Sequence, residues 1–284
     1  MKGIILAGGT GSRLYPITSS VSKQLLPIYD KPMIYYPLTT LMQMNIRQIL
    51  IISSNEYIDQ YKKLLGDGSR IGINIKYEIQ NKPNGIADAF LVGEKFINNN
   101  RIALILGDNI FYGNDLNPDI IKKFDQGGKI FLYKVNNPSQ YGVAEIKNKK
   151  ILKIIEKPKK TNSKFAVTGI YLYDKKVLDL VKTLKPSKRN EIEIIDLNNL
   201  YLNKKELSYK IFSRGTVWLD AGTHSSLLQT SEFVKTIQDR QKIFIACPEQ
   251  IALEKKWISI KEFKKLSAYN YKNDYGDYLR SLIE

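Results

Sequence analysis

A glycine-rich turn with two cations nearby is the first feature of this chain that could do chemistry. Gly8, Gly9 and Gly11 follow a short apolar stretch, and Arg13 and Lys23 come soon after them. Glycine permits positive φ and has no Cβ, so the backbone N–H groups of such a turn can converge on an anion. Arg13 and Lys23 could then neutralise a polyphosphate from two sides. The segment therefore predicts a nucleoside triphosphate as substrate.

The spacing excludes two common phosphate-binding glycine loops. A P-loop ends in Lys-Ser or Lys-Thr, and no such pair closes this turn. A dinucleotide fingerprint started at Gly9 would put Leu14 where its third glycine should stand. Asp30 follows roughly 20 positions on, as that fingerprint requires, but it stands in Tyr-Asp-Lys-Pro, which is typical of a turn. The remaining alternative is a plain surface turn, and the two cations argue against it.

Two aspartates that follow apolar segments are candidate metal ligands. Asp108 comes after residues 102–107, and Asp220 comes after residues 217–219. A carboxylate at the carboxyl edge of a sheet is exposed in the ligand crevice, and Mg²⁺ prefers oxygen ligands. The two carboxylates could hold one Mg²⁺ against a triphosphate. The alternative for either residue alone is a turn-forming or capping aspartate.

These residues need a sheet that brings strand ends to one edge. In the first half, short apolar or β-branched segments alternate with stretches of helical periodicity. The predicted strands are 3–6, 48–53, 74–79 and 101–106, and the predicted helices are 34–44, 56–65 and 86–97. This alternation predicts an α/β fold, a Rossmann-like and mostly parallel open sheet flanked by helices. Right-handed crossovers would place Ala7, Gln80 and Asp108 on its ligand-binding edge.

The second half of the chain has a different pattern. The predicted strands 130–135, 143–147, 151–156 and 165–173 have short links, so an antiparallel portion joins the sheet. Helices follow at 175–184 and 192–203, and strands at 207–212 and 217–220 return to the site. The chain is mostly helical from His224 on, and no low-complexity linker or internal repeat divides it. We predict a catalytic domain over residues 1–240 and a C-terminal helical segment over residues 241–284.

Composition narrows the class of protein. The 284 residues carry a formal net charge of +16, and 43% of them are hydrophobic, an ordinary fraction for a soluble globular protein. The lysines are spread along the chain, no basic helix is interleaved with aromatics, and one cysteine with one histidine cannot form a zinc finger. We therefore predict a lysine-rich solvated surface and no nucleic-acid partner.

The same composition bears on location. No run approaches the ~18 apolar residues that a membrane span needs, and the N-terminus does not resemble a secretory signal. Cys247 is the only cysteine, which fits a reducing compartment, and no nucleophile partner stands beside it. We expect a cytoplasmic protein without a membrane partner, in which Cys247 is inert.

Taken in order, the motifs resemble those of the sugar-1-phosphate nucleotidylyltransferase family. Residues 6–14 (LAGGTGSRL) and 23–27 (KQLLP) carry its signature. Residues 29–38 (YDKPMIYYPL) are similar to the glucose-1-phosphate thymidylyltransferases within it. Further matching segments are 65–68 (LGDG), 106–109 (LGDN), 140–143 (QYGV), 156–158 (EKP), 167–171 (VTGIY) and 218–224 (WLDAGTH). The resemblance covers essentially the whole chain.

The resemblance implies transfer of the thymidylyl group from dTTP to α-D-glucose 1-phosphate. The products would be dTDP-glucose and pyrophosphate, in the first step of dTDP-deoxysugar synthesis such as that of dTDP-rhamnose. Catalysis would fall to Arg13, Lys23 and Asp108, and Asp108 with Asp220 would hold one or more Mg²⁺ ions. The implied nucleotide-binding residues are Gly8, Gly9, Thr10, Gly11, Ser12, Gln24, Gln80, Gly85 and Asp88. The implied sugar-binding residues are Gly142, Glu156, Lys157, Val167, Gly169 and Tyr171.

On the sugar side, the resemblance assigns a role to each residue. Glu156 would bind sugar hydroxyls and Lys157 the sugar phosphate, although in isolation this pair is typical of an exposed strand end. Gly142 and Gly169 would let the backbone approach the sugar. Val167 and Tyr171 would line it.

On the base side, Gln80 and Gly85 resemble the thymine-reading positions of the family. The amide of Gln80 can donate and accept at a pyrimidine edge together. Asp88 departs from the pattern, because the family commonly has an amide side chain there. An ionised carboxylate cannot donate, which leaves its contact with base or ribose open or places it on the helix face.

The implied mechanism needs no acid–base catalyst. An oxygen of glucose 1-phosphate would attack the α-phosphorus of dTTP in line, so positioning and charge neutralisation dominate. Arg13 and the loop amides would stabilise the leaving pyrophosphate, Lys23 would balance charge on the α-phosphate, and Lys157 would hold the nucleophile. Since that nucleophile is already anionic at neutral pH, we expect His224, the only histidine, to be structural.

The resemblance also bears on assembly. It implies a homotetramer in which the C-terminal segment helps form an interface and a regulatory pocket, where a dTDP-sugar could feed back. Three other interpretations remain. The first is the same reaction with UTP, because uracil lacks only a methyl group and apolar pockets discriminate weakly. The second is a sugar-nucleotide sensor without activity, and the third is a nucleic-acid binder whose affinity depends on salt.

Overall fold

The computed structural model describes residues 1–268 and 272–284 and has a sheet at its centre. One half of the sheet is parallel, and its strands are β1 (Lys2–Leu6), β4 (Gln48–Ser53), β5 (Asn74–Ile79) and β6 (Ile102–Leu106). β1 pairs with β4 and β6, and β4 pairs with β5. β1, β4 and β6 are nearly continuous apolar runs because helices cover both of their faces, whereas β5, at the edge of the sheet, alternates apolar and polar residues.

The other half is mainly antiparallel. It contains β8 (Gly128–Lys134), β9 (Gly142–Lys147), β10 (Lys150–Glu156), β11 (Phe165–Tyr173) and β12 (Leu207–Ile211). β11 joins the two halves, since it pairs antiparallel with β6, β8 and β9. In the described residues this gives nine strands, in the order β10-β9-β11-β6-β1-β4-β5 with β8 and β12 off that path. The predicted fold class, including its antiparallel portion, is confirmed.

Helices cover the two faces of the sheet. One face carries α1 (Tyr35–Gln43), α2 (Ile58–Leu65) and α5 (Pro118–Lys123). The helices α9 (Pro248–Glu254), α10 (Ile260–Ser267) and α11 (Asp274–Ser281) continue the hydrophobic cluster of this face, with α9 packed on α1 and α10 on α9. The other face carries α3 (Asp88–Val92), α4 (Glu94–Ile97), α6 (Val177–Val181) and α7 (Ile194–Asn203). Successive side chains of a strand point to opposite faces of the sheet, so Ile5 packs against the first group of helices and Ile4 against the second. No helix in the described residues is long and apolar enough to cross a membrane.

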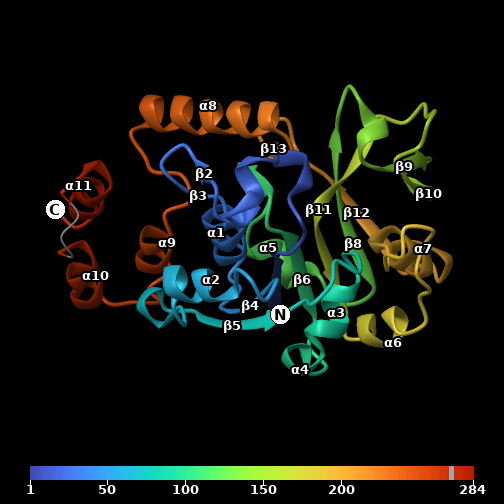
Figure 1. Cartoon of the computed structure of the whole chain (residues 1–284), viewed down its shortest axis with the longest axis horizontal. Helices are drawn as coiled ribbons and strands as arrows, with labels where there is room; N and C mark the ends of the chain where they lie inside the picture. Colours follow the sequence, from blue (N-terminus) through green and yellow to red (C-terminus); the bar gives the residue numbers. More distant parts are fainter. Residues whose placement is uncertain (269–271) are drawn as a thin grey trace.

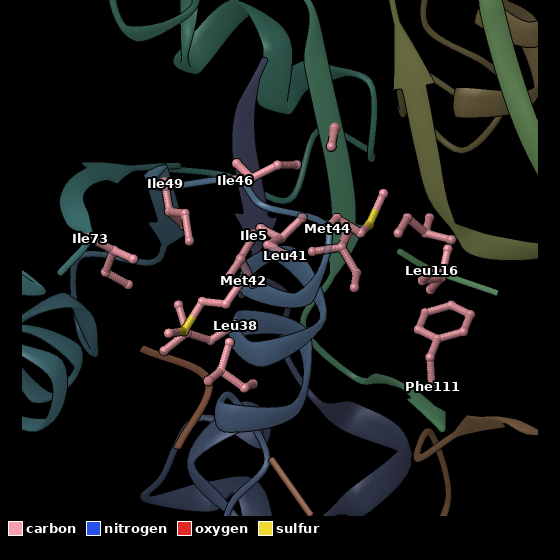
Figure 2. Close-up of a cluster of buried hydrophobic side chains, with 14 of the residues drawn as sticks. Ile5, Leu38, Leu41, Met42, Met44, Ile46, Ile49, Ile73, Phe111 and Leu116 are labelled. Carbon is pink, nitrogen blue, oxygen red and sulfur yellow. The ribbon is translucent and has the colours of Figure 1, made fainter. Parts of the chain in front are cut away.

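The first face is organised around α1. Figure 2 shows Leu38, Leu41 and Met42 of this helix gathered against Ile5 and Ile49 of the sheet. All five side chains are fully buried. The spacing of three and four residues puts the helix side chains on one stripe, which is what packing on a sheet requires. α1 thereby anchors the segment that follows the glycine turn.

The C-terminal helices share this core. Ile251, Phe263 and Leu279 are buried in the same cluster as the α1 side chains. Figure 1 shows α10 and α11 at one end of the molecule, with β9 and β10 at the opposite end. The helix α8 (His224–Gln241) runs between these regions and covers the two-residue strands β2 (Pro27–Ile28) and β3 (Lys31–Pro32). The division into 1–240 and 241–284 stays a prediction.

Several elements differ from the expectation. The helix predicted at 86–97 is two helices, α3 and α4, because Gly93 interrupts it. The predicted strand 207–212 is β12, which pairs with β8 and contributes no residue to the pockets described below. A short strand that was not predicted, β7 (Asn109–Tyr112), pairs antiparallel with β13 (Val217–Asp220). This last pairing matters most, because it forms part of the site.

Candidate active site

The glycine turn directly follows β1 and forms the wall of a pocket. Gly9 and Gly11 have φ values of 103° and 60°, in the left-handed region that favours glycine. Thr18 Oγ1 donates a 2.9 Å hydrogen bond to the carbonyl of Gly11 and stabilises the turn. We call this the glycine-loop pocket. Its lining residues are Gly8, Gly9, Thr10, Gly11, Ser12, Arg13, Lys23, Gln24, Asp108 and Gly222.

Two cations reach this pocket from different segments. Lys23 begins a 3-10 helix, Lys23–Leu25, and its side chain is buried in an ion pair with Asp108. Arg13 lies in a second 3-10 helix, Ser12–Leu14, and its side chain is exposed to solvent. The structure therefore brings together the two cations and the aspartate that the sequence indicated.

A second pocket, the central-sheet pocket, shares Arg13 and Asp108 with the first. It also contains Asp220 and all six predicted sugar-binding residues, Gly142, Glu156, Lys157, Val167, Gly169 and Tyr171. Its other lining residues are Ile86, Leu106, Asn109, Gln140, Tyr141, Ile194, Ile195 and Trp218. A molecule in one pocket would therefore face a molecule in the other across a shared arginine and a shared carboxylate.

Lys157 has an unusual backbone conformation in the central-sheet pocket. Its φ is 40°, which is rare for a residue with a side chain, and its N–H donates to the carbonyl of Tyr141 at 3.1 Å. Its Nζ lies 3.6 Å from Oε1 of Glu156, and about half of the side chain is exposed. Strained backbone of this kind is typical of functional sites. The ammonium group is available to a ligand while the backbone is fixed.

The pairing of β7 with β13 brings the two aspartates together. Asp220 is the register partner of Asn109, and the N–H of Ala221 donates to the carbonyl of Asp108 at 3.1 Å. Asp108 precedes β7 and Asp220 ends β13, so both carboxylates enter the central-sheet pocket. Their sequence separation hid this pairing from local pattern analysis.

The electrostatics of this pair suit a divalent cation. Burial acts to raise the pKa of Asp108, but attraction to Lys23 and its hydrogen bond outweigh this, and the pKa is lowered. Burial, and then repulsion from Asp108, raises the pKa of Asp220 to about 6. Two adjacent carboxylates with oxygen donors are suitable ligands for Mg²⁺. The described residues hold no group of three or more His, Cys, Asp or Glu placed to bind one metal ion together, so phosphates and water would complete the coordination.

Asn109 connects three elements behind Asp108. Its Nδ2 donates to Asp108 Oδ1 at 2.9 Å, and its Oδ1 accepts from the N–H of Gly169 at 3.0 Å and from Trp218 Nε1 at 2.6 Å. A β-carbon at position 169 would lie 2.5 Å from Asn109 Oδ1. Gly169 is therefore required for the close approach of Asn109, a reason that the sequence did not indicate. The only local signal for Asn109 was its place beside Asp108.

The predicted base-reading residues Gln80 and Gly85 form a group with Asp88 beside the glycine-loop pocket. Gln80 follows β5 and Asp88 begins α3, and both side chains are buried. Gln80 Nε2 donates to Asp88 Oδ2 at 2.7 Å and, at 3.4 Å, to the carbonyl of Gly85. The amide nitrogen is thus engaged within the protein, in contrast to the expectation that it donates to a pyrimidine. Asp88 is not on an open helix face.

His224 and Cys247, which were expected to take no part in catalysis, lie outside the two pockets. His224 is exposed at the start of α8, where Thr223 and Ser226 form the capping box, and it lines neither pocket. Burial, and then the carboxylate of Glu249, raises the pKa of Cys247 to about 12. The thiol is therefore protonated at neutral pH, as expected of an inert cysteine.

Known proteins resemble this chain along its length. The Nucleotidyl transferase family model matches residues 2–237. The glucose-1-phosphate thymidylyltransferase of Neisseria meningitidis is 50% identical over 287 aligned positions, which cover 100% of both chains. That of Xanthomonas campestris is also 50% identical and covers 100% of this chain and 97% of its own. A solved structure of a Bacillus anthracis glucose-1-phosphate thymidylyltransferase in complex with a sucrose is 47% identical, with a TM-score of 0.77 over 82% of this chain and 94% of its own.

Proposed function

This chain belongs to the nucleotidyl transferase family, and on that premise we propose that it is a glucose-1-phosphate thymidylyltransferase. It transfers the thymidylyl group from dTTP to α-D-glucose 1-phosphate and releases pyrophosphate. The dTDP-glucose formed enters dTDP-deoxysugar synthesis. The observation that carries the assignment is the pair of adjoining pockets that share Arg13 and Asp108.

The glycine-loop pocket accommodates the polyphosphate. The backbone N–H groups of the turn provide donors for phosphate oxygens, as in other glycine-rich anion sites. Arg13 neutralises the leaving pyrophosphate, and Lys23 moves from Asp108 toward the α-phosphate. Mg²⁺ held by Asp108 and Asp220 supplies positive charge to the phosphate oxygens when bound. The electrostatic compensation lowers the repulsion between two anionic reactants.

The central-sheet pocket accommodates the hexose phosphate. Lys157 holds its phosphate and Glu156 accepts from sugar hydroxyls, and Arg189 Nη2 lies 3.9 Å from the Glu156 carboxylate. Val167 and Tyr171 contact the apolar face of the ring. The phosphate oxygen then lies near the α-phosphorus for in-line attack, and no protein base takes part. The protein contributes position and charge.

The assembly and location are proposed on the resemblance. We expect a homotetramer in the cytoplasm, with residues 241–284 at an interface and with feedback by a dTDP-sugar. Neither nucleic acid nor membrane is a partner. Sedimentation analysis would measure the assembly directly.

The assay uses the purified protein with Mg²⁺ and glucose 1-phosphate. Each nucleoside triphosphate is added in turn and pyrophosphate release is measured. We expect dTTP to be used best and UTP detectably, because the two bases differ by one methyl group. Asp108→Asn is the inactive control. The absence of pyrophosphate with every triphosphate would favour the non-catalytic sensor.

A further inference from the structure

The hydrogen bond between Gln80 and Asp88 fixes the direction in which the Gln80 amide points. Both side chains are buried, with 7% and 8% of their surface exposed. An ionised carboxylate only accepts hydrogen bonds, so the amide group of Gln80 must turn its nitrogen toward Asp88. The 2.7 Å bond from Nε2 to Asp88 Oδ2 has this polarity, and the carbonyl of Gly85 accepts from the same nitrogen at 3.4 Å.

The amide oxygen of Gln80 consequently points the other way. A β-carbon at Gly8 would lie 3.1 Å from Gln80 Oε1, so this oxygen lies against the first glycine of the glycine-loop pocket. Among residues 1–268 and 272–284, no protein group donates a hydrogen bond to it. An amide oxygen without a protein donor is available as an acceptor for a ligand N–H.

We infer that Asp88 is a positioning residue, which fixes Gln80 so that its oxygen reads the imino N3–H of a pyrimidine. Thymine and uracil carry this hydrogen, whereas cytosine presents a lone pair at N3. A fixed amide oxygen therefore accepts from the first two bases and repels the third. The inference deepens the proposed function, on which it rests for the statement that the base lies beside Gln80.

The same arrangement explains why position 88 need not contact the nucleotide. A neutral amide at this position could accept from or donate to Gln80, so both orientations of the Gln80 amide would be allowed. The carboxylate removes that freedom. Discrimination against cytosine then depends on Asp88, although Asp88 itself does not contact the base. The repulsion arises between the fixed Gln80 oxygen and the lone pair at cytosine N3, and specificity often requires such a repulsive contact.

The test compares dTTP with dCTP in the wild-type protein and in Asp88→Asn. We expect the ratio of kcat/KM for dTTP to that for dCTP to fall roughly 10- to 100-fold in the variant, because the Gln80 amide can then turn and donate to cytosine N3. The loss of negative charge near the triphosphate affects both nucleotides equally and cancels in the ratio. Glu78→Gln is the matched control, since Glu78 is an exposed carboxylate two positions before Gln80, and its ratio should be unchanged.

A double variant that exchanges the carboxylate and the amide between positions 80 and 88 tests whether the direction of their hydrogen bond matters. In Gln80→Glu with Asp88→Asn, one carboxylate oxygen accepts from the new amide and the other faces the base as an acceptor, with the local charge conserved. We expect this double variant to regain most of the discrimination that Asp88→Asn loses. A purely structural role for Asp88 predicts no such recovery. An unchanged ratio in Asp88→Asn, or no recovery in the double variant, would overturn the inference.

A third measurement needs no variant and separates this inference from the proposed function. Calorimetry without glucose 1-phosphate measures the binding of dTTP and of its N3-methyl analogue to the wild-type protein. We expect the analogue to bind at least about 10-fold more weakly, because the bound base would cover the Gln80 oxygen without donating a hydrogen bond to it. Equal binding overturns the inference even if the enzyme is active. Tight, selective binding of dTTP without pyrophosphate release contradicts the proposed function and leaves the inference supported.

Discussion

At the scale of residues, the site contains charged side chains that can bind phosphates and a cation. Lys23 is paired with Asp108, and burial, followed by repulsion from the Asp108 carboxylate, keeps the pKa of Asp220 raised. Arg13 and Lys157 are exposed enough to meet a phosphate. Such an arrangement is stable without substrate and gains most when two phosphates and a cation arrive together.

Lys157→Ala should act mainly on the sugar phosphate. We expect the KM for glucose 1-phosphate to rise about 10- to 100-fold, because a charge-assisted contact is lost. The KM for dTTP should change little. Steady-state kinetics with each substrate varied in turn measures the difference.

Arg13→Ala is the contrasting variant, since Arg13 lines both pockets. We expect a fall of roughly 10²–10³ in kcat, as for the loss of a preorganised transition-state contact. Wild-type kcat in Arg13→Ala, or a rise in the KM for dTTP alone in Lys157→Ala, would contradict the roles proposed here.

At the scale of elements, the pairing of β7 with β13 and the central place of Asn109 hold the aspartates in position. Asn109 joins the end of β6 to β11 and β13 through three hydrogen bonds. The contact between Asn109 and Gly169 leaves no room for a side chain at position 169 of β11. The orientation of Asp108 thus depends on residues that are distant in sequence.

Gly169→Ala should displace Asn109 and with it Asp108. Overpacking costs about 1–3 kcal/mol, so the melting temperature should fall by roughly 3–10 °C, and kcat should fall with it. Differential scanning fluorimetry and the pyrophosphate assay measure the two effects. Gly215→Ala is the control, because nothing lies within 4 Å of a β-carbon there. Equal melting temperatures and equal kcat values for the two variants would show that Asn109 tolerates the displacement.

Asp115 fixes the turn that leads into β13. Its carboxylate accepts from the N–H of Ser213 at 2.6 Å and from Thr216 Oγ1 at 2.7 Å, and it lies 2.8 Å from Lys210 Nζ. Burial acts to raise the pKa of Asp115, but these hydrogen bonds, led by that of Lys210, lower it well below its usual range.

A carboxylate with a lowered pKa stabilises the fold above its unfolded pKa of about 3.9, and this stability is lost as pH falls toward the folded value. Asp115→Asn should therefore cost about 1–3 kcal/mol at neutral pH, with the difference from wild type shrinking below about pH 4. Urea unfolding at a series of pH values measures it. Asp59→Asn, which removes an exposed ion pair, should have little effect at any pH. A pH-independent difference for Asp115→Asn would contradict this explanation.

At the scale of the whole molecule, the C-terminal helices and the sheet share one core. Phe263 of α10 is fully buried in the cluster that contains the α1 side chains. We expect residues 241–284 to unfold together with the sheet. A regulatory role for this segment would then act through shared packing.

Phe263→Ala should destabilise the entire chain by about 3–5 kcal/mol. Urea unfolding followed by circular dichroism should show one shifted transition for the whole protein. Ile260→Ala on the same helix is the control, because Ile260 is 61% exposed and should cost less than about 0.5 kcal/mol. A separate early transition, with the rest of the curve unchanged, would indicate an independent C-terminal unit.

The sequence by itself determined the features that depend on local order. The glycine turn, the cations after it, the strand-end aspartates and the alternation of strands and helices could all be predicted, because residue type and periodicity encode them directly. The boundaries of β4, β5, β11 and β13 were predicted to the residue. Each of these strands ends at a clear turn signal in the sequence.

Only the tertiary structure decided which distant groups meet. Asn109 bonds to residues 60 and 109 positions away, and its amide shows no periodicity that would predict either partner. The polarity of Gln80 became visible only when the fold placed Asp88 against it. Hydrogen bonds between side chains depend on angstrom-scale placement by the packed core. Local pattern can therefore supply the chemistry of a residue, while the fold fixes the direction in which that chemistry acts.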